Sequence, residues 1–552
     1  MTKKKNFKLN DISKNPGKPL VNITAADLMP LPYPHPCDNP EQQVIGKLTE
    51  QQAQMYESAL DGVVCAAIPR PQSKAEEEAL VGKFLKGLEK LFSEENNWTF
   101  LQPLKLSMDY CLKCQNCSDA CPTYIASGRQ EIYRPTWRSE IFRRIYNRYL
   151  NGENRFLSWL NGDDIDLNWT TIARLGESAY RCTLCRRCTQ SCPIGIDNGL
   201  IAHEIRKLFS QEMGIAAKEL HEKGSVQQLQ VGASTGMSPK ALSSVIRFME
   251  EDIEEKTGRK IRIPVDKKGA DILLIHNAGE FVSWPENPAA FAVILEEAGI
   301  SWTLSSELVG YDAVNYGVWY DDVQLAKVAL KHGKIARDLN VKKIVIGECG
   351  HAHKASLVVS DRVYPPELNV PRESCMPVLE EIVFSGKLKL DPRRNNFPVT
   401  LHDPCNMVRL EGIVEPQRRI LRYIAPQFRE MTPHGVNNYC CGGGAGFAIM
   451  SSMNLPDWKL GISGRMKAKQ LLDVFQDVIS PEITKFICAP CSNCKAQFRD
   501  LIEYYKLEER YSIHYTGLVD LIVNAMVDTP VPYLEQAPAI EEMAAIDKEA
   551  LV

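Results

Sequence analysis

The sequence has no long apolar run and almost no net charge, and both absences narrow what the protein can be. The longest apolar runs, such as Val63 to Pro69, are far too short to span a bilayer. The start, Met1 to Lys5, is followed by polar residues rather than by the apolar segment of a secretory signal. The formal net charge of -4 leaves no basic surface for nucleic acid. We therefore expect a cytoplasmic chain with no nucleic-acid partner, whose association with a membrane depends on another subunit.

The 552 residues suffice for about two to four ordinary domains. Changes in the sequence pattern along the chain divide it into the segments that we expect. These segments are an N-terminal arm and helix that bind a partner (1–100), a helical domain (101–215), a linker (216–268), two α/β units (269–395 and 396–528) and a tail (529–552).

Cysteine is abundant, and its spacing indicates metal binding rather than disulfides. The chain has 18 cysteines, of which Cys37, Cys65, Cys349 and Cys375 are scattered and the others are clustered. A cytoplasmic chain of this length needs no disulfide staples. We expect Cys37, Cys65 and Cys375 to be buried and structural.

Two clusters have the same four-cysteine spacing. Cys111-x2-Cys114-x2-Cys117-x3-Cys121-Pro122 recurs as Cys182-x2-Cys185-x2-Cys188-x3-Cys192-Pro193. In this run three cysteines hold one [4Fe–4S] cubane and the fourth reaches the neighbouring cluster. We therefore assign Cys111, Cys114, Cys117 and Cys192 to one cubane, and Cys182, Cys185, Cys188 and Cys121 to the other. Zinc needs only four thiolates in one tetrahedron and explains the repeated run poorly.

Arginines interleaved with aromatic residues lie between the two motifs. The arginines are Arg134, Arg138, Arg143, Arg144, Arg148 and Arg155. They could form the solvated face of an amphipathic helix or offset the negative clusters, or they could dock an acidic partner. We favour a solvated face or an offset of the negative clusters over a docking face, because charge runs are usually solvated faces.

After residue 268 short β-branched runs alternate with amphipathic helices, which indicates an α/β architecture. We expect strands at 272–275, 344–346 and 399–401, and helices at 416–424 and 465–475. A faint duplication is also present. The segments around His276, Tyr316 and Cys349 occur in the order and rough spacing of those around Cys405, Cys440 and Cys491. The second copy has the cysteines and the first has almost none.

The second copy holds an unusual constellation. Cys405 is followed by Cys440-Cys441-Gly442-Gly443-Gly444-Ala445-Gly446, and then by Cys488-x2-Cys491-x2-Cys494. Adjacent cysteines are poorly placed for a relaxed mutual disulfide. The glycines let the backbone approach a bulky inorganic core, and no Lys-Ser/Thr follows them, so a phosphate loop is not supported.

This pattern resembles the CCG (cysteine-rich) domain of heterodisulfide reductases, in which five cysteines hold a noncubane [4Fe–4S] cluster. Cys405, Cys440, Cys441, Cys491 and Cys494 match that motif, although the gap between Cys441 and Cys491 is longer than usual and Cys488 offers a second CxxC. The Glu348-Cys349-Gly350-His351 segment resembles heterodisulfide reductase D-type catalytic subunits. The resemblance implies a helical two-cluster ferredoxin domain followed by two duplicated α/β CCG units, the first degenerate, which together are an α+α/β fold.

Within that family the chain is most similar to DsrK-type catalytic subunits of the Dsr membrane complex of sulfate reducers. The long N-terminal arm, the degenerate first unit and the Tyr439-Cys440-Cys441-Gly442 run carry this likeness. The resemblance implies a membrane cytochrome b partner (DsrM-like), further Dsr subunits, the thiol carrier protein DsrC as substrate, and a peripheral position on the cytoplasmic face of the membrane.

The expected reaction is reductive cleavage of a disulfide or trisulfide at the third cluster. His351 or Glu348 would supply protons, and Cys349 is either an extra ligand at the cluster or an inert relic. His402, His434 and His353 are more often structural than catalytic. Two alternatives stay open: the iron–sulfur subunit of a glycolate- or lactate-type oxidase, which pairs with a flavin subunit, and a pure electron conduit.

Overall fold

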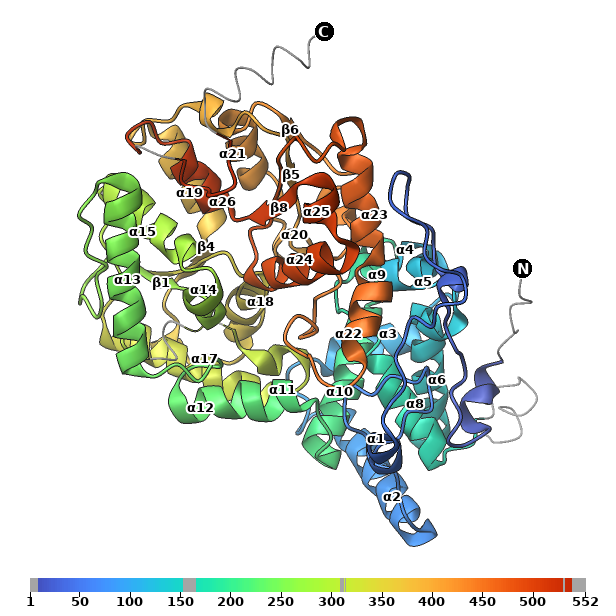
Figure 1. Ribbon diagram of the computed structural model, residues 1–552. Coiled ribbons are helices and arrows are strands. Elements are labelled where there is room, and N and C mark those ends of the chain that lie inside the picture. Colours follow the sequence, from blue (N-terminus) through green and yellow to red (C-terminus); the bar gives the residue numbers. More distant parts are fainter. Residues whose placement is uncertain (1–7, 152–164, 308–311, 313, 530–531, 539–552) are drawn as a thin grey trace. The chain divides into compact units, whose positions relative to one another are not determined.

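The computed structural model describes residues 8–151, 165–307, 312, 314–529 and 532–538 (Figure 1). Two compact units divide the chain. The first comprises Met1–His221, Trp319–Asp322 and Gly442–Lys469, and the second comprises Glu222–Val318, Val323–Cys441 and Gln470–Val552. The glycine-rich loop that follows Cys441 therefore belongs to the first unit, although the sequence pattern groups it with the second α/β unit. None of the described helices is long and apolar enough to cross a membrane.

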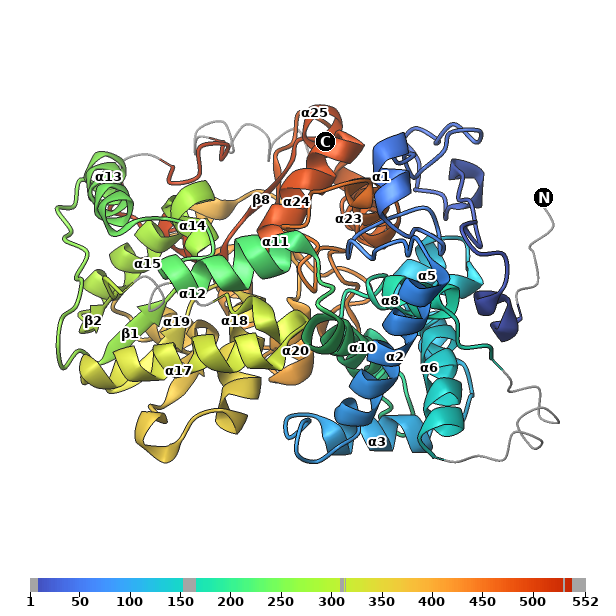
Figure 2. The same ribbon diagram turned by 90° about the horizontal axis from the view of Figure 1, so that it is seen from below.

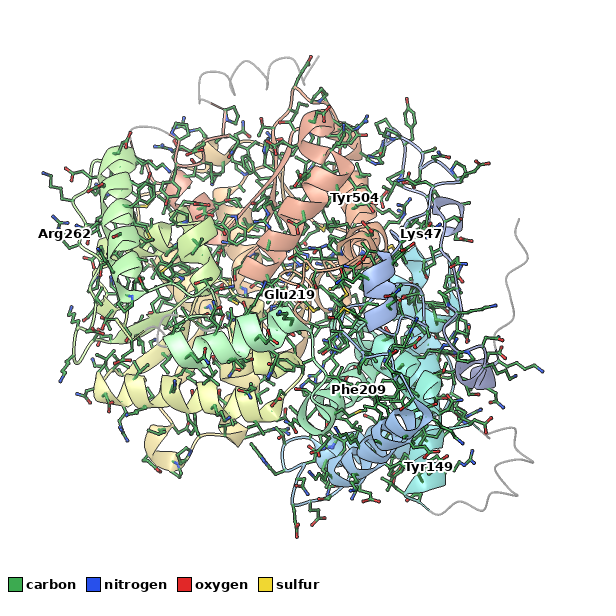
Figure 3. The ribbon with its side chains drawn as sticks, turned by 60° about the horizontal axis from the view of Figure 1, so that its bottom comes forward. Lys47, Tyr149, Phe209, Glu219, Arg262 and Tyr504 are labelled. Carbon is green, nitrogen blue, oxygen red and sulfur yellow. The ribbon has the colours of Figure 1, made fainter. Side chains whose placement is uncertain are left out.

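The first unit is helical, as expected for 101–215. Its helices are α1 (Glu50–Met55), α2 (Lys74–Leu91), α3 (Leu101–Asp109), α4 (Asn116–Ala120), α5 (Pro122–Ala126), α6 (Pro135–Tyr149), α8 (Trp169–Ala179), α9 (Arg187–Gln190), α10 (Asn198–Met213), α11 (Lys218–Leu220) and α22 (Leu455–Trp458). Helix α10 packs against α2, α3, α6 and α8 (Figure 2). Its Phe209 meets Phe84 of α2 edge-on, with ring centroids 6.3 Å apart (Figure 3). Gly176 of α8 allows this packing, because a Cβ there would lie 2.6 Å from the Phe209 ring.

The N-terminal arm lies on the helices of its own chain. Buried Arg174 of α8 binds the arm, because its guanidinium donates to the carbonyls of Ile12, Lys14 and Lys18 at 2.6–2.7 Å. Arg465 binds the arm further along, through the carbonyl of Met29 at 2.6 Å. A partner for this arm stays a prediction.

The scattered cysteines differ in exposure. Cys65 and Cys375 are buried, as expected, and burial raises the pKa of both thiols. Cys37 is exposed, so the expectation that it is buried was wrong. It lies in the proline-rich part of the arm, which rests on the surface of the helices instead of entering their core.

The central arginines between the motifs do not form a solvated face, so that part of the interpretation was wrong for them, whereas Arg138 fits an offset of the negative clusters, because its charge opposes the raised pKa of the Cys121 thiol. Arg138 and Arg143 are buried. Arg138 donates to the carbonyl of Ser178 at 3.1 Å, and Arg143 pairs with Glu140 at 2.7 Å. Arg138 thereby joins α6 to α8, and Arg143 joins α6 to α3, because it also donates to the carbonyl of Ser107 at 3.2 Å. Arg155 lies outside the described residues.

The second unit contains two four-stranded parallel sheets. Their strands are β1 (Ile272–Ile275), β2 (Trp302–Thr303), β3 (Lys343–Ile346) and β4 (Arg372–Ser374) in the first sheet, and β5 (Val399–Leu401), β6 (Phe428–Arg429), β7 (Lys485–Cys488) and β8 (Ile513–Thr516) in the second. The strand orders are β2-β1-β3-β4 and β6-β5-β7-β8, which is the same order twice. The expected α+α/β fold is confirmed, and the repeated strand order agrees with the faint duplication.

Helices connect and cover these strands. They are α12 (Gln227–Val231), α13 (Pro239–Thr257), α14 (Ala278–Ser283), α15 (Glu286–Glu297), α17 (Asp322–Asp338), α18 (Gly350–His353), α19 (Cys375–Phe384), α20 (Cys405–Leu410), α21 (Pro416–Ile424), α24 (Ser492–Tyr505), α25 (Leu507–Tyr511), α26 (Leu518–Asn524) and α23 (Arg465–Val474), whose first residues up to Lys469 belong to the first unit. The three expected strands and two expected helices are present. The segment expected as a linker holds α13, whose buried face (Leu242, Ile246, Met249 and Ile253) joins the hydrophobic core of both sheets.

Both halves place polar residues where the strands end. His276 follows β1, Glu348 and Cys349 follow β3, His402 and Cys405 follow β5, and Cys491 follows β7. In a parallel sheet these carboxyl ends lie on one edge, which is where α/β folds build their sites. The fold therefore gathers residues that are far apart in the sequence.

Candidate iron–sulfur sites

The two ferredoxin-like motifs share an unusual loop conformation. Lys113 and Gln115 flank Cys114 with positive φ angles of 54° and 68°. Leu184 and Arg186 flank Cys185 in the same way, at 53° and 59°. A non-glycine residue in this region costs about 1–2 kcal/mol. The alternation of left-handed residues with cysteines winds each loop tightly around a common centre.

The structure brings the cysteines together in the crossed sets that the spacing predicted. Cys111, Cys114, Cys117 and Cys192 line one small cavity. Cys121 lies with the second motif instead, where burial and then the neighbouring thiols of Cys185 and Cys182 raise the pKa of the Cys121 thiol to about 12. Burial and then Cys111 raise the pKa of Cys117 to about 11. Thiols in such sites ionise only when a metal takes up their charge, which fits the chemistry of an iron–sulfur cluster.

The two sites differ in exposure. Cys114 of the first set is exposed, and exposed Tyr110, Leu112 and Ile194 lie close to it in sequence or beside the cavity. Cys185 of the second set is buried. The first site is therefore the more accessible from solvent.

The second motif contacts the glycine-rich loop. Arg206 of α10 donates to the carbonyl of Cys182 at 2.7 Å and to the carbonyl of Ala445 at 3.2 Å. A Cβ at Gly444 would lie 2.5 Å from the carbonyl oxygen of Thr183. The missing side chain therefore permits this close approach, and Arg206 bridges the two loops.

A third site lies at the carboxyl edge of the second sheet. The Sγ atoms of Cys441 and Cys494 are 3.4 Å apart, and both residues are buried. Cys491 directly precedes α24, which runs from this buried turn toward exposed Tyr504 (Figure 3). A hydrogen bond from the Cys494 thiol, helped by backbone N–H groups, lowers the pKa of the Cys491 thiol although burial opposes this. This turn favours a thiolate, the form that binds iron.

Gly350 of the first half contacts the sulfur of Cys491. Its N–H donates to Cys491 Sγ at 3.2 Å. A Cβ at residue 350 would lie 3.2 Å from that sulfur and 3.3 Å from Cβ of Pro404, the residue before Cys405. Glycine at this position thus brings Cys491 and the start of α20 together.

A buried ion pair holds the turn that leads to Cys440 and Cys441. Arg418 binds both carboxylate oxygens of Asp403, at 2.7 and 2.6 Å. Asp403 also accepts from the backbone N–H of Gly435 at 2.6 Å, and Arg409 donates to the carbonyl of Val436 at 2.7 Å. Charge-assisted bonds of this kind fix the position of the backbone that carries the cysteine pair.

Cys488 occupies a different environment from the other cysteines of the constellation. It ends β7 inside the hydrophobic core, and burial followed by the charge of Glu348 raises the pKa of its thiol. The CxxC that contains Cys491 and Cys494 is therefore the one aimed at Cys441.

Cys349 and the histidines near it are buried as well. Asn493 Nδ2 lies 3.7 Å from Cys349 Sγ, and burial raises the pKa of this thiol. Burial, helped by Lys354, lowers the pKa of His351 to about 3, so its imidazole is neutral at ordinary pH. His353 bonds to the carbonyl of Cys349 and to Ser374 Oγ, both at 2.8 Å, which is a structural role.

Sequence reasoning missed a buried charge cluster beside the third site. Lys495, next to Cys494, lies 3.2 Å from Glu280 Oε1 and 4.0 Å from Glu348 Oε2. Glu348 also accepts from the backbone N–H groups of Leu518 and Val519 at 2.8 and 3.1 Å. Lysine directly after Cys494, a predicted ligand, was the available signal, but its buried partners come from the other half of the unit.

Two family descriptions match the chain. A 4Fe-4S dicluster domain matches residues 107–196, and a cysteine-rich domain (CCG) matches residues 399–499. They coincide with the paired ferredoxin-like motifs and with the intact half of the second unit.

Curated relatives cover most of the chain. The "Hdr-like menaquinol oxidoreductase iron-sulfur subunit 2" of Archaeoglobus fulgidus is 28% identical over 77% of this chain and 80% of its own length. A protein of Methanosarcina acetivorans, one of the subunits of its dihydromethanophenazine:CoB--CoM heterodisulfide reductase, is 26% identical over 74% of this chain and 91% of its own length. The "EtfAB:quinone oxidoreductase" of Syntrophomonas wolfei is 22% identical over 76% of this chain and 58% of its own length. With its dicluster and cysteine-rich domains, the chain is similar to Hdr-like iron–sulfur oxidoreductase subunits, and both domains support the binding of 4Fe–4S clusters.

Proposed function

We propose that this chain is the catalytic subunit of a membrane quinol-linked complex that reduces a disulfide or trisulfide. Two [4Fe–4S] cubanes would feed a third, noncubane [4Fe–4S] cluster. The observation that carries the proposal is the third site itself, where Cys441 and Cys494 face each other and Cys491 is prepared as a thiolate. Bound there, the cluster would deliver electrons singly to a disulfide, which accepts two electrons and two protons to give two thiols.

The proposed ligands of the third cluster are Cys405, Cys440, Cys441, Cys491 and Cys494. The lowered pKa of Cys491 and its contacts with Cys494 support this set. Cys488 is left out, since its thiol lies among apolar side chains of the core. The proposed ligands of the two cubanes remain the crossed sets, each of which shares one environment.

We propose an order for the two cubanes. The first, at Cys111, Cys114, Cys117 and Cys192, would receive electrons, because Cys114 is exposed. The second would pass them on, because its loop is bridged by Arg206 to the loop that begins one residue after Cys441. Arg206→Lys should slow reoxidation of the second cubane while leaving the iron content unchanged.

The thiol products need protons. We propose His351 and Glu348 as the residues near Cys349 that supply them. His351 is neutral and can give up only a ring N–H proton, whereas burial raises the pKa of Glu348 to about 7. A His351→Ala variant with unchanged turnover across pH would remove His351 from this role.

The proposed partners follow the resemblance to DsrK-type subunits. They are a cytochrome b membrane subunit (DsrM-like) and other Dsr subunits on the cytoplasmic face, with the thiol carrier DsrC as substrate in dissimilatory sulfur metabolism. Support comes from the relatives named as subunits of an Hdr-like menaquinol oxidoreductase and of a heterodisulfide reductase.

The test is reoxidation of the dithionite-reduced protein by the disulfide form of the carrier under anaerobic conditions. We expect two thiols for each two electrons lost, followed by absorbance and thiol titration. In Cys441→Ser, reduction of both cubanes should persist while reoxidation by the disulfide stops. Equal reoxidation rates in the two proteins would leave the chain as an electron conduit and would refute the proposal.

A further inference from the structure

The third site contains a buried histidine that the cysteine motif does not include. One ring nitrogen of His402 and the Sγ atoms of Cys441 and Cys494 all lie within 4.8 Å of one another. His402 is 1% exposed. Ligand atoms of a single iron or zinc ion are held at about 2.0–2.3 Å from the metal, so three such atoms lie a few ångströms apart. The trio therefore has the spacing of donors to one metal ion.

The protein holds His402 at its backbone and at its ring. The backbone N–H of His402 donates to the carbonyl of Cys488 at 2.8 Å, which ties the residue to the neighbouring strand β7. On the other side the ring packs edge-on against Phe498 of α24, with centroids 5.1 Å apart. Phe498 lies one helical turn after Cys494, so the same helix carries a sulfur ligand and the wall that orients the imidazole.

The degenerate half provides an internal control. His276 follows β1 as His402 follows β5, and it is buried to the same extent. Its ring also packs edge-on against a phenylalanine, Phe291, at 5.1 Å. However, His276 Nδ1 lies 3.4 Å from a carboxylate oxygen of Glu280. At equivalent places one imidazole meets a carboxylate and the other meets two thiols.

We infer that His402 is a nitrogen ligand that would hold the third cluster beside Cys441 and Cys494. The inference rests on the proposed third cluster and adds a residue to its ligand set. Neutral imidazole is a common iron ligand, and histidine in place of cysteine raises the reduction potential of an iron–sulfur centre. The third cluster would thereby accept electrons more readily than one held by thiolates alone.

The test uses the full chain with its clusters, labelled with 15N-histidine. Pulsed EPR of the third cluster should show a 15N hyperfine coupling that is absent in His402→Gln and present in His276→Gln. His402→Cys, which offers a thiolate in the same place, should retain the iron content and shift the potential of the third cluster downward. Iron analysis of each variant shows that the clusters are still bound.

The outcomes separate this inference from the proposed function. A third-cluster signal without histidine nitrogen coupling, or an unchanged coupling in His402→Gln, would overturn the ligand assignment alone. Absence of any third-cluster signal in a wild-type protein with both cubanes would overturn the proposed function and the assignment together.

Discussion

The two halves of the second unit have the same strand order but different chemistry at the same edge. Cys349 and Cys491 each lie three residues beyond the end of the third strand of their half, after β3 and β7. Each donates its backbone N–H over 2.7 Å to the carbonyl two residues earlier. Yet Ala352 stands in the first half where Cys494 stands in the second. The fold therefore persists without the cysteines, and the cysteines belong to the site.

The surroundings of the Cys491 and Cys349 thiols also differ between the two halves. Cys494 and backbone N–H groups lower the pKa of Cys491, whereas burial raises the pKa of Cys349. Hydrogen bonds to the charged form stabilise a thiolate, and desolvation disfavours it. The turn at Cys491 in the intact half therefore favours a thiolate, and the degenerate half contributes Gly350, Glu348 and Cys349 to its border.

The largest expected effect separates these two cysteines. Cys491→Ser should lose the third cluster and keep both cubanes, because it removes the thiolate that the turn stabilises. Cys349→Ser, its matched control, should keep all three clusters. Iron content and EPR of the anaerobic proteins measure both. Loss of the third cluster in both variants would make Cys349 a ligand and would end the contrast between the halves.

Lys495 joins the halves electrostatically, so its removal should be strongly destabilising. Lys495→Met leaves buried Glu280 and Glu348 without their cation. Breaking a buried pair in this way costs about 3–5 kcal/mol in the free energy of unfolding.

The control for this change is Arg499→Met on the same helix, whose side chain is 52% exposed. An exposed pair contributes at most about 1 kcal/mol. Denaturant titration at pH 7 compares the two variants. Equal losses of stability would show that the buried charges do not hold the halves together.

Glu348 should make stability depend on pH. Burial raises the pKa of Glu348 to about 7 from its ordinary value of 4.5, although Lys495 opposes the shift. The folded state therefore binds the proton more tightly, and this residue's contribution to stability falls as the pH rises from about 4.5 to about 7.

Glu348→Gln removes that contribution. The variant should gain stability relative to the wild type at about pH 7.5 compared with about pH 4.5, as measured by unfolding at both values. A difference between the two proteins that stays constant across this range would contradict the raised pKa.

The smallest expected effect concerns Cys488. Cys488→Ala should keep every cluster and lose about 1 kcal/mol or less of stability, because it removes one small buried group from the core. Iron analysis checks the first part, and thermal unfolding checks the second. A missing third cluster in this variant would return Cys488 to the ligand set.

Local patterns made much of the fold predictable. The β-branched runs at β1, β3 and β5 and the amphipathic segment at α21 carry their own periodicity, and the crossed cysteine sets follow from a fixed loop spacing. Those signals lie within short stretches of sequence.

The remaining features depend on contacts between distant segments. The sequence pattern indicates surface charge at Arg138 and Arg143, but their partners are carbonyl and carboxylate groups that are in place only when the helices have folded. The place of His402 beside Cys441 and Cys494 depends on two crossovers of the sheet. The bridge from Arg206 to Ala445 spans 239 positions in the chain. Such pairings between distant segments cannot be predicted from local periodicity in the sequence.

The most direct test of the central claim is EPR of the anaerobically purified, oxidised protein with and without the reduced thiol carrier. We expect a paramagnetic signal that appears only with the thiol and vanishes in Cys440→Ser and Cys441→Ser, while both cubanes remain. A wild-type protein with intact cubanes and no thiol-dependent signal would contradict the proposed reaction at the third site and place the sulfur chemistry in a partner.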